Sequence, residues 1–185
     1  MRCINLKNLL MSRIIILFLF SASISFSSCN EKLPEIKQEG CYFQYEYVNY
    51  AWGFSHSGFT ITPSGEVYTF DKNTIWVFAQ KDRLSISDLQ KNIAASVKVD
   101  TLIIKSDIDR YQQLALSAMS GTLSKAVSQG ADMGGISCKI IVPDSSDPQN
   151  SYREVLLTVS GDFEQHNLAP EAAVIADWLS KMHRH

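Results

Sequence analysis

An aromatic-rich segment spans residues 42–59, and its part that least resembles a strand, residues 52–58 (WGFSHSG), contains two aromatic rings, two hydroxyls and a histidine. Aromatic side chains stack on sugar rings and anchor protein interfaces. We therefore predict a binding loop here, with Trp52, Phe54 and His56 as its candidate contacts. The competing interpretation places these aromatic residues in a core and at the rim of a sheet, because half of a strand's side chains normally face inward.

A hydrolase is the alternative function for the same histidine, His56. However, the segment GFSHSG is one residue too long for the G-x-S-x-G motif that presents a nucleophilic serine. The sequence also contains no Ser-x-x-Lys, His-Glu-x-x-His, Walker A or G-x-G-x-x-G motif. The residues favour a binding domain over an enzyme, and no cofactor is predicted.

A second group of polar residues, Asp162, Glu164 and His166, alternates in the segment GDFEQHN. In an extended chain these side chains would share one side and offer two oxygens and one nitrogen to a divalent metal. A closed metal site usually needs four ligands, whereas polar residues at a strand end usually face water. The group is a weak metal candidate and the second candidate centre for a hydrolase.

The N-terminus has the order of features found in a secretory signal. Arg2, Lys7 and Arg13 precede an apolar run, IIILFLF, and then a serine-rich stretch that ends at Cys29. If translation began at the second methionine, Met11, the chain would still have a workable signal peptide, because Arg13 and the apolar run follow it. The serines interrupt the apolar run too early for a transmembrane helix, which needs about 17 residues or more.

The sequence Phe26-Ser27-Ser28-Cys29 resembles the lipobox of bacterial lipoprotein signal peptides, although Phe26 replaces the commoner leucine. The resemblance covers residues 1–29 only. It implies cleavage before Cys29, a diacylglycerol thioether on that cysteine and, often, an additional amide-linked acyl chain. It also implies a cell-envelope location with the membrane contacted through lipid, and Asn30 favours the outer membrane over the inner one.

Composition supports a small acidic domain behind this anchor. Cleavage would remove three of the 17 basic residues and none of the 19 acidic ones. The mature chain has no basic surplus of the kind that nucleic-acid binding requires. We expect a signal peptide at 1–28, a lipidated cysteine and flexible tether at 29–40, and a single domain at 41–185. Possible partners are an envelope protein, a glycan or a small ligand, with protease inhibition as one analogy.

Two cysteines remain in the predicted domain, Cys41 and Cys138. An exported domain with two thiols favours one disulfide. The alternative is two separate buried thiols, because cysteine packs well as a small hydrophobic residue.

The fold prediction follows from the period of the apolar residues. Alternation or short apolar runs predict strands, and 3.6-residue spacing predicts helices. The expected strands are 42–49, 59–62, 66–71, 75–79, 99–104, 136–142 and 152–160; the expected helices are 85–97, 106–121 and 170–182. Short connections favour antiparallel pairing. We predict an α+β fold with a single, largely antiparallel sheet and about three helices packed on one face.

Overall fold

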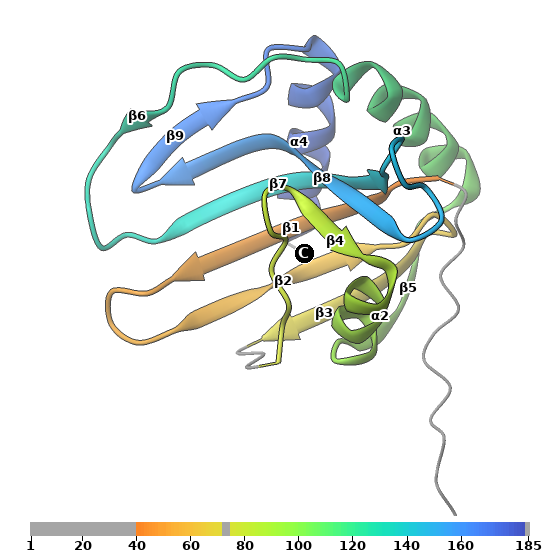
Figure 1. The fold of residues 1–185 in the computed structure, drawn as a ribbon, viewed down its shortest axis with the longest axis horizontal. Helices are drawn as coiled ribbons and strands as arrows, with labels where there is room; N and C mark the ends of the chain where they lie inside the picture. The colour runs from red at the N-terminus through yellow and green to blue at the C-terminus, as the bar shows by residue number, and fades with distance from the viewer. Residues whose placement is uncertain (1–39, 72–74, 184–185) are drawn as a thin grey trace, which may run out of the picture. The chain divides into compact units, whose positions relative to one another are not determined.

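The computed structural model describes residues 40–71 and 75–183, which form an antiparallel sheet with three helices (Figure 1). The strands are β1 (Tyr42–Asn49), β2 (Ser55–Ile61), β3 (Glu66–Asp71), β4 (Arg83–Ser85), β5 (Val97–Leu102), β6 (Val127–Ser128), β7 (Gly135–Pro143), β8 (Ser151–Gly161) and β9 (Phe163–His166). Their order is β5-β3-β2-β1-β7-β8-β9-β6, with β4 paired to β8. Every strand pairing in the described residues is antiparallel, so the predicted α+β class is confirmed.

The three helices cover both faces of this sheet. Helices α3 (Lys105–Ala118) and α4 (Pro170–His183) pack on the face to which Phe43 and Tyr45 of β1 point. Helix α2 (Ile86–Ala94) belongs to a second core, built with Tyr42 on the opposite face. Successive side chains of a strand point to opposite faces. The start of β1 has apolar side chains on both faces of the sheet. The prediction that the helices pack on one face therefore holds for α3 and α4, whereas α2 packs on the other face.

The chain between β3 and β4 lies over the second face without forming a strand. The expected strand at 75–79 is therefore wrong. The backbone of Val77 pairs with a side chain instead of a neighbouring strand: its N–H donates to Oδ1 of Asn92 and its carbonyl accepts from Nδ2, both at 2.8 Å. Asn92 is a buried residue of α2, so these two bonds hold the segment against that helix.

The disulfide predicted between Cys41 and Cys138 is not formed. Both thiols are buried and free. Cys138 lies opposite Tyr45 in the β1–β7 register, four positions along the chain from Cys41. At about 3.3 Å per residue this offset is about 13 Å, whereas a disulfide needs Cα atoms within about 7 Å. The Cys41 thiol instead contacts Oε1 of Gln112 at 3.1 Å.

The predicted signal peptide, the lipidation of Cys29 and most of the tether lie outside the described residues and stay predictions. The described residues belong to one compact unit. None of the helices in the described part of the chain has the length and apolar character that a bilayer crossing requires.

Candidate binding site

The tip of the β1–β2 hairpin exposes three aromatic side chains. Tyr50, Trp52 and Phe54 are 69%, 87% and 42% exposed, and the rings of Tyr50 and Phe54 lie 5.4 Å apart. The tip begins with a local turn in which Oδ1 of Asn49 accepts the N–H of Ala51 at 2.8 Å. Two of the three binding candidates from the sequence, Trp52 and Phe54, are therefore available to a partner.

The third candidate, His56, is fully buried and is not available to a partner. Its ring sits among the rings of Phe70, Trp76 and Phe78, with centroids 4.8–5.0 Å away. Its Nε2 atom lies 3.2 Å from Oε2 of Glu46, while Nδ1 has no hydrogen-bond partner in the described residues. The histidine ties β2 to β1 and to the segment that precedes β4, so its position indicates support for the hairpin.

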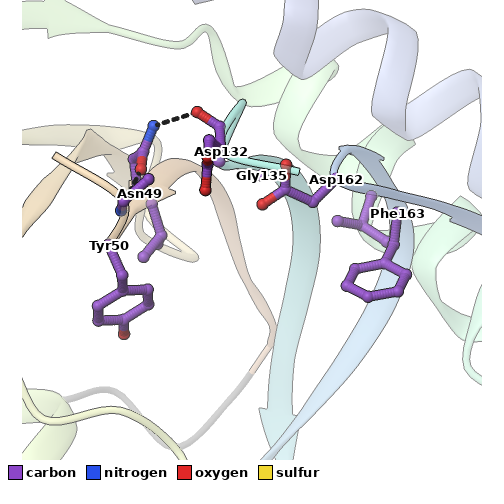
Figure 2. Close-up of a pocket in the computed structure, with 10 residues that line it drawn as sticks. Asn49, Tyr50, Asp132, Gly135, Asp162 and Phe163 are labelled. Carbon is purple, nitrogen blue, oxygen red and sulfur yellow. Dashed lines mark hydrogen bonds between the residues drawn. The ribbon is translucent and has the colours of Figure 1, made fainter. Parts of the chain in front are cut away.

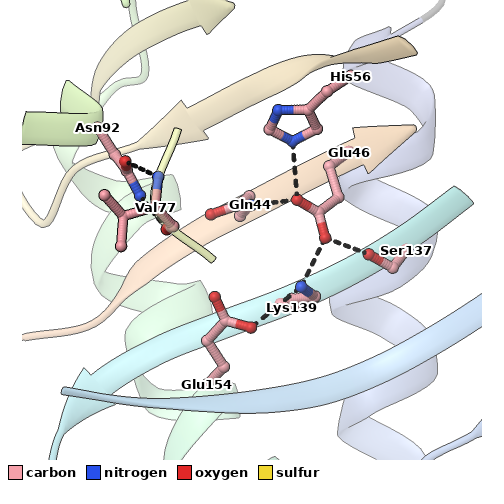
Figure 3. Close-up of polar contacts among 8 residues, drawn as sticks. All are labelled: Gln44, Glu46, His56, Val77, Asn92, Ser137, Lys139 and Glu154. Atoms are coloured by element: carbon pink, nitrogen blue, oxygen red, sulfur yellow. Dashed lines mark hydrogen bonds and ion pairs between the residues drawn. The ribbon is translucent and has the colours of Figure 1, made fainter. Parts of the chain in front are cut away.

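Glu46 is the centre of a buried polar network on the second face of the sheet (Figure 3). Besides His56, its carboxylate accepts hydrogen bonds from Nε2 of Gln44 at 2.8 Å and from the hydroxyl of Ser137 at 3.0 Å. Nζ of Lys139 lies 2.5 Å from its Oε1 atom. These contacts join β1, β2 and β7; Glu46 lies four residues before Tyr50 of the tip, and His56 lies two residues after Phe54.

The charges of this network depend on one another. Burial alone would raise the pKa of Glu46, but the hydrogen bond with His56 and the charge of Lys139 outweigh it and lower the pKa to about 2. Lys139 also contacts Glu154 at 3.0 Å, and the two carboxylates outweigh its burial and raise its pKa. Burial raises the pKa of Glu154. An ionised Glu46 paired with a charged Lys139 is therefore the core of the network.

The order of contacts in the network does not form a nucleophilic relay. A serine hydrolase needs a histidine beside the serine, with the carboxylate behind the histidine. Here Glu46 stands between Ser137 and His56, so His56 does not accept the serine proton. No observation in the described residues therefore supports His56 as a hydrolytic base.

A cleft of about 450 Å³ opens beside the hairpin tip (Figure 2). Its lining comes from the end of β1, the loop before β7 and the β8–β9 turn, which are distant in sequence. The lining residues are Val48, Asn49, Tyr50, Ala51, Asp132, Gly134, Gly135, Val159, Asp162 and Phe163. Tyr50 both lines the cleft and contacts Phe54 of the tip, so the tip and the cleft form one continuous surface.

Close backbone contacts fix the shape of this cleft. A Cβ atom on Gly134 would lie 2.6 Å from the carbonyl oxygen of Val48, and one on Gly161 would overlap the carbonyl oxygen of Gly134. Both glycines have positive φ angles, 73° and 128°. The carboxylate of Asp162 accepts the N–H of Met133 at 2.8 Å and so holds the loop before β7 against the β8–β9 turn. The cleft is thus built by tertiary contacts.

The proposed metal ligands Asp162, Glu164 and His166 do not form a metal site. The described residues contain no group of three or more His, Cys, Asp or Glu side chains able to hold a metal ion. Asp162 instead binds the backbone of Met133, and Glu164 accepts from Nε2 of Gln129 at 2.7 Å. The alternation in the sequence was real, but Asp162 lies in the turn before β9 while the other two lie within that strand.

Several residues of this surface were missed by sequence analysis. Tyr50 belongs to the aromatic-rich segment, and its place just beyond β1 was the available signal. Asp132 and Phe163 carried no comparable signal, because the loop before β7 and the short strand β9 meet β1 only in the folded chain. No protein-family model, no curated protein and no solved structure matches this chain significantly.

Proposed function

We propose that this protein is a binding module of the bacterial cell envelope, anchored by lipid on Cys29, which recognises another envelope protein through the hairpin tip and the adjacent cleft. The observation that carries the proposal is the exposure of Tyr50, Trp52 and Phe54 at a tip supported by buried contacts. The lipobox supports the anchor, and Asn30 favours the outer membrane.

Exposed aromatic side chains at one point of a surface are typical of protein recognition. Trp and Tyr are enriched at binding hot spots, where large rings are buried at low entropic cost. The buried network fixes the strands that carry the tip, so little further ordering is needed on binding. The cleft adds a concave surface beside the exposed tip. The contacts of His56 do not favour a hydrolase centred on that residue, because Glu46 separates its ring from the hydroxyl of Ser137.

Site-specific photo-cross-linking in the native envelope tests this function. A photoreactive phenylalanine derivative replaces Trp52 in the full-length lipoprotein, and a matched chain carries it at Val97, an exposed residue of the edge strand β5 that is 68% exposed. We expect a discrete protein adduct from position 52 that is absent from position 97 and is lost on Tyr50→Ala. Equal adducts from both positions, or none from position 52, would overturn the proposal.

The anchor is tested separately by the intact mass of the membrane-extracted protein. Cleavage before Cys29 with added acyl chains is the expected result. A mass that includes residues 1–28, or one without acyl chains, would contradict the lipid anchor while leaving the binding surface untouched.

A further inference from the structure

The cleft beside the hairpin tip carries two carboxylates without a basic partner. Asp132 and Asp162 line it, and none of its lining residues is Lys, Arg or His. No ion pair found in residues 40–71 and 75–183 involves either of them. Other carboxylates of the domain, such as Glu46, Glu66 and Asp144, do have cationic partners. The cleft therefore has a negative charge that the described chain does not neutralise.

The rest of the cleft offers aromatic and aliphatic surface. Tyr50 and Phe163, at opposite sides of the cleft in Figure 2, are 69% and 57% exposed. Val48 and Val159 add aliphatic lining. A carboxylate beside an exposed ring is a favourable setting for an organic cation, because the ring face attracts positive charge and the carboxylate accepts its hydrogen bonds. The lining thus indicates a ligand that is both cationic and partly apolar.

An inorganic divalent cation fits this lining less well. Calcium takes six to eight oxygen ligands, and magnesium requires an octahedral set. The cleft offers two carboxylates, and Oδ1 of Asp162 already accepts the N–H of Met133. A guanidinium group is planar, binds carboxylates through several donors and stacks on aromatic rings. Its aliphatic stem would lie against apolar lining such as Val48 and Val159.

We propose that the cleft receives an arginine side chain of the partner protein, held between the carboxylates of Asp132 and Asp162 and the exposed rings of Tyr50 and Phe163. This inference rests on the proposed function, because it assigns the chemistry of one contact within that binding surface. The acidic balance of the chain, with 19 acidic and 17 basic residues before signal cleavage, is consistent with a basic partner.

The test compares two small probes that differ in charge. Nα-acetyl-argininamide and its neutral isostere Nα-acetyl-citrullinamide are titrated into the full-length lipoprotein in detergent micelles, and binding is followed by ligand-observed saturation-transfer NMR. We expect the arginine probe to bind at least about fivefold more tightly, because an exposed ion pair and a cation–π contact both favour the charged guanidinium over the neutral urea group. Added salt should reduce this preference.

Matched charge variants locate the binding. Asp132→Asn with Asp162→Asn should abolish the preference for arginine, and the new amide at position 162 would keep an oxygen for the Met133 N–H. The control, Asp100→Asn with Asp107→Asn, changes the net charge equally at exposed positions outside the cleft and should keep the preference.

Three results would overturn the inference: no arginine signal, equal binding of the two probes, or an arginine preference that survives in the cleft variant. Binding of neutral N-acetylglucosamine that depends on Asp132 and Asp162, without any arginine preference, would also overturn it and would indicate a glycan. The cross-link from position 52 distinguishes failure of this inference from failure of the proposed function. If that adduct persists while the arginine preference is absent, only this inference fails; if the adduct is absent, the proposed function fails.

Discussion

Replacing Glu46 by glutamine tests the buried network through its pH dependence. Glutamine keeps the shape of the side chain, removes its charge and replaces one acceptor oxygen with an NH2 donor, so it resembles the protonated carboxyl group. The pKa of Glu46 is lowered from an ordinary 4.5 to about 2. One pKa unit corresponds to about 1.4 kcal/mol, so the ionised carboxylate contributes about 3 kcal/mol to the free energy of unfolding at neutral pH. Glu46→Gln should lose about this amount at pH 6.

The sign of the pH effect follows from the lowered pKa. A carboxyl group that is more acidic in the folded chain stabilises it above the unfolded pKa, and this contribution disappears as the pH falls through the folded pKa. The wild-type protein should therefore lose the contribution of Glu46 between about pH 4.5 and pH 2. Glu46→Gln has no such group to titrate, so the difference between the two proteins should shrink towards zero over that interval.

Urea denaturation followed by tryptophan fluorescence at a series of pH values measures this difference. Glu66→Gln is the matched control, because Glu66 also forms a short ion pair, with Lys98 at 2.6 Å, but both side chains are at least a third exposed. The control should cost less than about 1 kcal/mol. A difference for Glu46→Gln that is below about 1 kcal/mol, or that stays constant from pH 6 to pH 2, would refute an ionised Glu46 as the centre of the network.

Three further predictions concern local features. Asn92→Ala removes both bonds to the segment before β4 and should cost about 2–3 kcal/mol in urea denaturation, with faster amide exchange in that segment; unchanged exchange would contradict this role. Gly161→Ala should cost more than Gly53→Ala, by about 2 kcal/mol, because both have positive φ but only the first added Cβ meets backbone; equal melting temperatures would refute the steric argument. Burial raises the pKa values of Cys41 and Cys138 to about 12 and about 11, so iodoacetamide should modify neither thiol in the native protein and both in urea without reductant. Peptide mapping that finds a cysteine blocked in urea would contradict two free thiols.

The elements were largely predictable from sequence because their signals are local. Alternation in β1 and helical spacing in α4 depend on neighbouring residues, and so does the start of α2, where the hydroxyl of Ser85 accepts the N–H of Asp88 at 3.1 Å. The short strand β4 and the failed strand at 75–79 depend on distant contacts instead. Asn92 supplies the hydrogen bonds that a neighbouring strand would have supplied to Val77. The sequence of residues 75–79 alone does not indicate that a side chain of α2 takes this place.

The candidate site was only half predictable for the same reason. Trp52 and Phe54 stand out by composition, and they are indeed exposed. His56 belongs to the same short segment, but its side chain is buried. Its surroundings come from Glu46 on the neighbouring strand β1 and from Phe70 on β3, which the segment itself does not contain. The cleft depends on the pairing of β1 with β7, which are about 90 residues apart, so no window of sequence contains it.

The burial of His56 supports the proposed role of the exposed tip, because it restrains the strands on either side of that tip. A hairpin tip without interior contacts would lose conformational freedom on binding, and that loss would weaken the complex. Here the strand that enters the tip carries Glu46, and the strand that leaves it carries His56, so the 3.2 Å contact between them fixes the two arms close to the exposed rings. Weakening the contact between Glu46 and His56 should therefore reduce binding through Trp52, even though neither of these two buried residues would touch the partner protein. The Glu46→Gln variant tests this at neutral pH, under conditions where the domain is still folded. A weaker cross-link from position 52 would then show that the contact acts on the rigidity of the tip and not only on the stability of the domain.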